Sequence, residues 1–197
     1  MPARIPPIEP GAASEETVDE LLREASEGWY EDAAFFGAMA HQPTIFRRLV
    51  DVLAAFPQHE ALDTQLLELV RLRIARVHAC AYCATVRTSA VREDVAPREA
   101  AVLGDDIDEE QLSRPEALAV RLADLLSRDP HRISDSFFAE LREEFGDEAL
   151  VELLLFCSLE VGLDRFTIAL ELDTTGEGPY PSGLEYPLSD PEPRDGG

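Results

Sequence analysis

The sequence predicts an all-α protein, with a helical domain of about nine helices over residues 14–172. Apolar residues recur at helical spacing through most of this range, and no convincing run alternates apolar and polar residues as a strand would. Prolines and glycines gather in residues 1–13 and 173–197, where no helical period is present, so we expect an extended tail at each end. At 197 residues and 45% hydrophobic content, the chain can form one domain with a sizeable core.

The first three predicted helices follow start signals of different kinds. Thr17 and Glu20 have the spacing of a capping box, and apolar residues follow at helical spacing as far as Trp29. A short second helix is expected over residues 31–40. Pro43 suits the first position of a third helix, because its φ is already helical and its missing amide proton is not needed there.

The next four helices are expected in the middle of the chain. Asp63 or Thr64 can cap the fourth, and the fifth is expected from residue 80 to about residue 93. Pro97 opens a short sixth helix, and the seventh covers residues 115–127.

Two more helices complete the domain. Ser134 can cap the eighth, which we expect to end at Gly146 because glycine readily adopts the backbone conformation that closes a helix. The ninth covers residues 147–172 and is apolar on nearly every side. We therefore expect it to be the central buried helix.

The charge balance excludes several classes of function. Acidic residues outnumber basic ones 40 to 17, which gives a formal charge of -23, whereas nucleic acids and anionic membranes attract a basic surface. All the basic residues are arginine, so a Schiff-base lysine and a phosphate-binding Walker lysine are both excluded.

No membrane or export segment is predicted. The most apolar stretch, near residues 150–170, is interrupted by charged side chains and is too polar to span a bilayer. These charged residues are Glu152, Glu160, Asp164 and Arg165. Residues 1–10 lack the features of a signal peptide, so we expect a soluble, cytoplasmic protein.

The strongest local motif is Cys80-Ala-Tyr-Cys83. Cysteines at this spacing near a helix start can form a disulfide, and the amides there stabilise a thiolate. Two alternatives remain open: a pair of small buried residues, or zinc ligands completed by His78 and Cys157. A thioredoxin-like site is disfavoured because the βαβ pattern that accompanies it is missing.

Glu68 lies twelve residues before Cys80, among apolar neighbours. Partial burial would raise the pKa of its carboxyl and suit it to act as a general base. The alternative is a solvated helix face, or a salt bridge with Arg71, three residues later on the same helix. Spacing alone leaves both interpretations open.

The stretch from Glu68 to Cys83 resembles the alkylhydroperoxidase AhpD-like and carboxymuconolactone decarboxylase superfamily. That family's pattern is a glutamate, about a dozen residues, and a CxxC motif with an aromatic residue before the second cysteine. The segment around His41 also looks like the one that precedes the family's first core helix. The resemblance covers roughly residues 30–172 and is most specific over 66–90.

The resemblance implies an all-helical fold that assembles as a dimer, trimer or hexamer. It also implies a hydroperoxide substrate and a dithiol reductant. Cys83 would attack the peroxide, Cys80 would resolve the product as a disulfide, and Glu68 would be the relay base. No metal or organic cofactor is expected, because the dithiol itself carries two electrons.

One position departs from the family pattern. Arg87 stands where the family has its relay histidine, and an arginine cannot act as a base because it stays protonated. If it shares a helix face with Cys83, its charge would stabilise the thiolate. His78 or His41 would then have to take the role of the family's relay histidine.

Two other functions remain open. One is a carboxymuconolactone decarboxylase-like enzyme, although its dianionic substrate suits an acidic protein poorly. The other is a non-enzymatic helical oligomer that acts as a binding or stress-response module. Residues Tyr180 to Leu188 of the C-terminal tail carry apolar side chains that we expect to help hold a homo-oligomer together.

Overall fold

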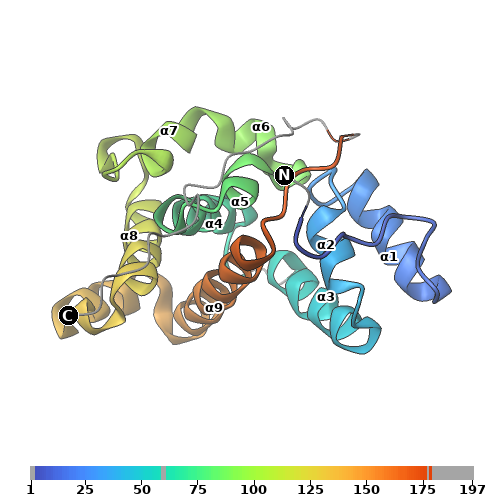
Figure 1. The fold of residues 1–197 in the computed structure, drawn as a ribbon. Helices are drawn as coiled ribbons and strands as arrows, with labels where there is room; N and C mark the ends of the chain where they lie inside the picture. The colour runs from blue at the N-terminus through green and yellow to red at the C-terminus, as the bar shows by residue number, and fades with distance from the viewer. Residues whose placement is uncertain (1–2, 59–60, 177, 179–197) are drawn as a thin grey trace, which may run out of the picture.

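A computed structural model describes residues 3–58, 61–176 and 178, and these are helices joined by turns and loops, with no strand among them (Figure 1). The prediction of an all-α fold is therefore confirmed. The helices are α1 (Glu16–Glu27), α2 (Ala34–Met39), α3 (Pro43–Gln58), α4 (Thr64–His78), α5 (Ala81–Thr85), α6 (Arg92–Val95), α7 (Glu99–Leu103), α8 (Arg114–Arg128) and α9 (Asp135–Leu170). Short 3-10 turns lie at Ser89–Val91, Ala96–Arg98, Glu109–Gln111 and Pro130–Arg132.

Most of the predicted helix starts are confirmed. α3 begins at Pro43. The side chain of Asp63 accepts a hydrogen bond from the amide of Gln65 at the start of α4, and the hydroxyl of Ser134 accepts one from the amide of Phe137 at the start of α9. These side chains satisfy amides that have no partner within the helix.

The capping box expected at Thr17 is wrong. α1 begins one residue earlier, so Thr17 is already helical, and Glu15 precedes the helix without a side-chain cap. A capping box is present instead at α8, where the Glu116 carboxylate accepts from both the amide and the hydroxyl of Ser113.

The expected helix over residues 80–93 is also wrong, because α5 ends at Thr85 and Val86 is extended. Two arginine side chains explain the break. Arg87 donates to the carbonyls of Ala84, Thr85 and Val86, and Arg71 donates to those of Cys83 and Val86. These donors satisfy carbonyls that a longer helix would have bonded to its own amides.

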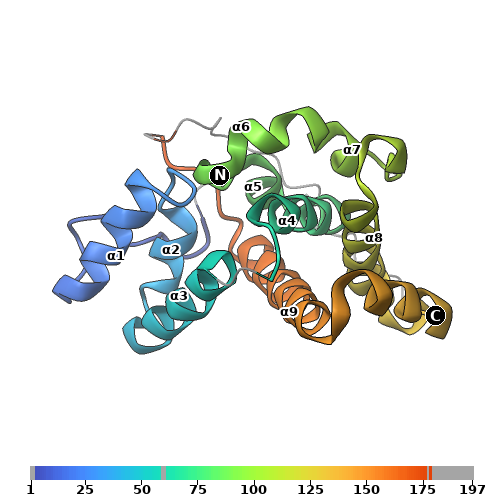
Figure 2. The ribbon, with the colours of Figure 1, turned by 180° about the vertical axis from the view of Figure 1, so that it is seen from behind.

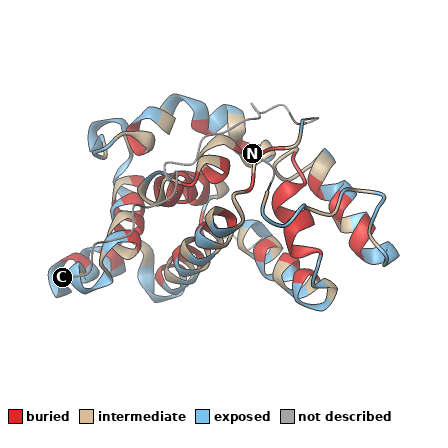
Figure 3. Cartoon of the chain, in the orientation of Figure 1, coloured by how far each residue is buried: buried red, intermediate tan, exposed pale blue. Residues whose placement is uncertain are grey.

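Gly146 interrupts α9, as expected. Its φ of 72° lies in the left-handed region that favours glycine, and it separates the two helical segments of α9. The prediction that residues 147–172 form the central helix is wrong, because Val151 and Leu155 are 55% and 61% exposed. The central helix is α4, in which every residue from Leu66 to Ala75 is buried (Figure 3).

Two apolar clusters form the core, with the functional region between them. One joins α4 to α8 and to the middle of α9, and the other joins α1, α2 and α3 to α5. Figures 1 and 2 show α1–α3 on one side of α9 and α8 on the other. α4, α5 and the second half of α9 meet where the two clusters adjoin.

The N-terminal segment packs against the domain. The amide of Arg4 donates to the carbonyl of Leu170, and that of Ile8 donates to the carbonyl of Gly37. A Cβ on Gly37 would lie 2.5 Å from the Ile8 carbonyl oxygen, so only glycine allows this close approach.

At the other end, the amide of Thr175 donates to Asp32, whereas Tyr180 to Leu188 lie outside the described residues. Among the described helices, none combines the length and the apolar character that crossing a bilayer requires.

Candidate redox site

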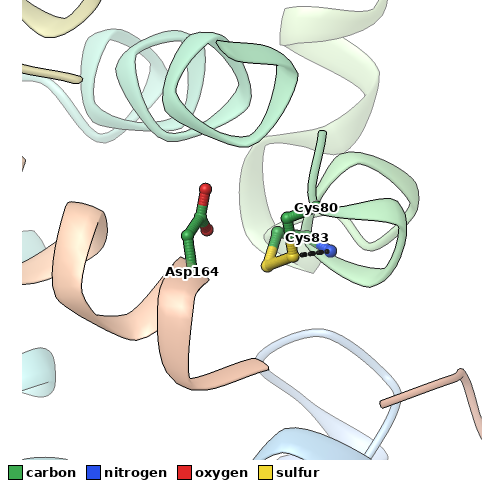
Figure 4. A group of neighbouring side chains, drawn as sticks. All are labelled: Cys80, Cys83 and Asp164. Atoms are coloured by element: carbon green, nitrogen blue, oxygen red, sulfur yellow. Dashed lines mark hydrogen bonds between the residues drawn. A yellow bond between two sulfur atoms is a disulfide. The ribbon is translucent and has the colours of Figure 1, made fainter. Parts of the chain in front are cut away.

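Cys80 and Cys83 are joined by a disulfide at the start of α5 (Figure 4). Ala79 adopts the left-handed conformation and ends α4, so the chain turns and Cys80 becomes the residue that caps α5. The Sγ of Cys80 accepts a hydrogen bond of 3.3 Å from the amide of Cys83. The structure thus shows the motif as a bonded pair at a helix N-terminus, the environment that stabilises a thiolate when the bond is reduced.

The two cysteines differ in access. Cys80 is fully buried, whereas Cys83 is 8% exposed and lines a cavity of about 20 Å³. A second cavity, of about 410 Å³, shares four lining residues with the first: Tyr30, Leu53, Arg71 and Glu160. Cys80 lines neither cavity, so a small molecule arriving through them meets Cys83 first.

Glu68 is buried and fully engaged by hydrogen-bond donors. Its two carboxylate oxygens accept bonds of 2.8 and 2.7 Å from Arg71, and bonds of 3.1 and 2.7 Å from the amide and hydroxyl of Thr88. Burial alone would raise the pKa of Glu68, but the charge of Arg71 and these hydrogen bonds outweigh it and hold the pKa below its usual value. The salt-bridge interpretation is therefore confirmed, and the expectation of a raised pKa is wrong.

The Glu68–Arg71 pair also fixes the backbone that carries the cysteines. Arg71 donates bonds of 2.7 Å to the carbonyls of both Cys83 and Val86. One buried guanidinium thus connects α4 to the last residues of α5.

Arg87 does not share a helix with Cys83, because α5 ends before it. The expectation that Arg87 shares a helix face with Cys83 is therefore wrong. Its guanidinium forms two hydrogen bonds, of 2.7 and 2.9 Å, with the carboxylate of Glu99 on α7. Together with its bonds to carbonyls at the end of α5, this pairing joins α5 to α7.

The two candidate histidines lie in different places. His41 is exposed, and its Nε2 lies 2.9 Å from the Pro6 carbonyl oxygen in the N-terminal segment. The side chain of His78 is 9% exposed at the end of α4, and its Nδ1 lies 3.3 Å from an oxygen of Asp164. Only His78 of the two contacts a carboxylate beside the disulfide.

Asp164 and Glu160 on α9 belong to the site but were not predicted as functional residues. A carboxylate oxygen of Asp164 lies within 4.8 Å of both cysteine sulfurs (Figure 4). Glu160, one helical turn earlier, lines both cavities. The available signal was a pair of carboxylates four residues apart in an otherwise apolar helix.

Burial raises the pKa values of both carboxyl groups on α9. Burial raises the pKa of Glu160 to about 8 against the opposing charge of Arg71. It also raises the pKa of Asp164, although the hydrogen bond and charge of His78 partly oppose this. Both carboxyl groups line the same cavity as Cys83, and the pKa of each moves towards neutrality.

The cysteines and Asp164 are also the one group in the described part of the chain with spacing suited to a metal ion. In the disulfide form neither sulfur is a thiolate, so the arrangement seen is a disulfide beside a carboxylate. Cys157 is distinct from this group: it is a free, buried thiol on α9 whose pKa is raised by burial.

The fold is shared with two solved structures. One is the crystal structure of an alkylhydroperoxidase AhpD core, an uncharacterised peroxidase-related protein from Ralstonia eutropha JMP134. It matches with a TM-score of 0.68 and 16% identity over 89% of this chain and 93% of that one. The other is a cysteine-to-alanine variant of the debrominase Bmp8 in complex with 2,3,4-tribromopyrrole. It matches with a TM-score of 0.71 and 14% identity over 88% of this chain and 92% of that one.

No family model and no curated protein matches the sequence. The structural likeness alone therefore carries the comparison, and it confirms the AhpD-like helical fold that the resemblance around Glu68 and Cys83 implies.

Proposed function

We propose that the protein is a thiol-disulfide oxidoreductase that reduces hydroperoxides with the Cys80–Cys83 pair. The observation that carries the proposal is the disulfide at the start of α5, with Cys83 facing a cavity and Cys80 buried behind it. The AhpD-like fold supports the same assignment.

The chemistry divides into three balanced steps. The Cys83 thiolate attacks the hydroperoxide ROOH, which gives a Cys83 sulfenic acid and the alkoxide RO⁻, protonated to ROH. The Cys80 thiol then condenses with the sulfenic acid, which forms the disulfide and releases water. An external dithiol reduces this disulfide by exchange and is itself oxidised to a disulfide.

The cavities favour a hydroperoxide with an apolar organic group. The larger cavity is walled by aromatic and aliphatic side chains, among them Trp29, Phe56, Leu67 and Phe156. Its one positively charged lining side chain, Arg71, is already paired with Glu68 at 2.7 Å, so the lining offers no unpaired positive charge to hold a dianion. The site therefore suits an alkyl or aryl hydroperoxide better than the dianionic lactone of a decarboxylase.

A second candidate is reductive debromination of an aromatic ring, which the aromatic walls of the larger cavity favour. The debrominase of the same fold is seen with 2,3,4-tribromopyrrole. Two thiols would supply two electrons, and the products would be the ring with hydrogen in place of bromine, bromide, a proton and the disulfide. Bromide release from tribromopyrrole by the reduced protein would distinguish this activity from peroxide reduction.

We also propose a homo-oligomer that works in the cytoplasm. Apolar side chains on α3 and α9, among them Ile45 and Leu155, are exposed in the single chain at 63% and 61%. A second copy would cover such side chains, and the high negative charge would restrict acidic residues to the rim of the contact.

Counting thiols tests the proposed redox cycle. The unfolded, fully reduced chain should show three reactive thiols, because it has three cysteines. After exposure of the folded protein to peroxide, one thiol should remain, that of buried Cys157, and treatment with a dithiol should restore all three. Three thiols after peroxide would contradict the proposal.

A further inference from the structure

The residues that the resemblance assigns to proton transfer are held by other partners. Glu68 accepts four hydrogen bonds from Arg71 and Thr88, and these stabilise its charged form. Arg87 is paired with Glu99 and is not a base. A thiol that attacks a peroxide still needs a proton acceptor, and the leaving oxygen needs a proton donor.

α9 places two carboxyl groups where these proton transfers occur. Glu160 and Asp164 are 6% and 1% exposed, and both line the cavity that Cys83 lines. Asp164 lies within 4.8 Å of both sulfurs, a separation that one water or a small side-chain shift on reduction can close. Glu160 lines the larger cavity as well, where the body of a substrate would lie.

The Asp164 carboxylate is poorly satisfied by other groups. Its Oδ2 is buried without a well-directed hydrogen bond, and so are both ring nitrogens of His78, whose Nδ1 lies 3.3 Å away. An oxygen left without a strong donor can accept a proton from a nearby thiol. His78 lies beside this oxygen without a well-directed hydrogen bond, so it leaves the oxygen available as a proton acceptor.

The charged and titratable groups around the two carboxyls come from several elements. They are Glu68, Arg71 and His78 on α4, Cys80, Tyr82 and Cys83 at α5, Tyr30 before α2, and Cys157 and Arg165 on α9. Burial is the largest influence on both α9 carboxyls, and the positive charge of Arg71 opposes it at each. The result is a carboxyl on Glu160 that holds its proton near neutral pH.

We propose that Asp164 removes the proton from the Cys83 thiol and that Glu160 donates a proton to the leaving oxygen of the hydroperoxide. This assignment rests on the proposed peroxidase function. As the sulfur–oxygen bond forms and the oxygen–oxygen bond breaks, the thiol proton moves to Asp164 and the Glu160 proton moves to RO⁻. The proton on Asp164 later returns to Glu160, one helical turn away, and both groups are restored.

The test follows a single turnover of the reduced protein with cumene hydroperoxide across a pH series. The background is Cys157→Ala, and disulfide formation is the signal. The rate should rise with pH as Asp164 loses its proton and fall as Glu160 ionises near pH 8. Asp164→Asn should slow the reaction roughly 10²-fold or more and remove the rising part of the plot of rate against pH. Glu160→Gln should remove the falling limb and slow the reaction roughly tenfold or more.

A second measurement separates proton transfer from damage to the site. Iodoacetamide alkylation of Cys83 at neutral pH reports the thiolate fraction without peroxide. Glu160→Gln should be alkylated at the parent rate while its peroxide reaction slows, because iodide leaves without a proton. Asp164→Asn should slow both reactions, because each needs the thiol proton removed. Slower alkylation of Glu160→Gln, or parent-rate alkylation of Asp164→Asn, would overturn the proposal.

The matched control is Asp147→Asn, an exposed carboxylate on the same helix, which should leave the rate and its pH profile unchanged. Parent-like profiles in both α9 variants would overturn the acid–base assignment and leave the peroxidase function standing. A parent protein that does not react with hydroperoxide would overturn both.

Discussion

Replacing Arg71 with methionine is expected to lower the free energy of unfolding by about 3–5 kcal/mol, because one partner of a buried ion pair is removed. The variant loses the guanidinium that binds Glu68 and the carbonyls of Cys83 and Val86. The Glu68 carboxylate then keeps only the two donors of Thr88 in a buried setting. Urea denaturation of the oxidised protein measures the change.

An exposed pair provides the control. Arg114 donates to Glu144 with 63% of its side chain exposed, so Arg114→Met should change the free energy of unfolding by less than about 1 kcal/mol. The double variant Arg71→Met with Glu68→Leu removes both charges and should recover part of the stability lost in Arg71→Met. Equal decreases in the free energy of unfolding in Arg71→Met and Arg114→Met would show that the buried pair is not what holds α5 to α4.

The second large effect concerns stability and pH. In the unfolded chain Glu160 titrates near 4.5, and burial in the folded protein raises the pKa to about 8. The folded state therefore holds this proton more tightly, so the contribution of Glu160 is fully favourable below pH 4.5 and is lost as the pH rises towards 8. At 1.36 kcal/mol per pKa unit, the loss is up to about 5 kcal/mol.

The variant Glu160→Gln isolates this contribution, because glutamine has a similar shape and does not titrate. The free energy of unfolding of Glu160→Gln minus that of the parent should increase steadily between pH 5 and pH 8 in chemical denaturation. A difference that stays constant over this interval would mean that Glu160 titrates in the folded protein as it does in the unfolded chain.

Much of the fold could be predicted because short-range signals determine it. Pro43, Asp63 and Ser134 each start a helix through their own backbone or side-chain chemistry, and Gly146 interrupts α9 through its positive φ. The end of α5 could not be predicted in this way. It depends on Arg71, twelve residues before Cys83, whose side chain reaches the α5 carbonyls only after the chain has folded.

The same difference between short-range and long-range contacts applies to the candidate site. The CxxC pair and the Glu68–Arg71 pair are close in sequence, so their spacing was informative. Asp164 is far from Cys83 in the sequence, and its carboxylate reaches the sulfurs because α9 packs against α5. Periodicity shows that residues 147–172 are mostly apolar, but it does not show which helix their few carboxylates will face.

The central claim, that the Cys80–Cys83 pair reduces hydroperoxides, is tested most directly by the rate of peroxide consumption. The rate is measured with an excess of dithiol for the parent, Cys83→Ser and Cys157→Ala. Cys83 supplies the attacking sulfur in the proposed cycle, whereas Cys157 is buried on α9 outside the disulfide. Loss of the nucleophile leaves only the uncatalysed reaction, so the rate of peroxide consumption by Cys83→Ser should be about 10³-fold lower or more. Cys157→Ala should consume peroxide at the parent rate. Parent-like consumption by Cys83→Ser would contradict the account.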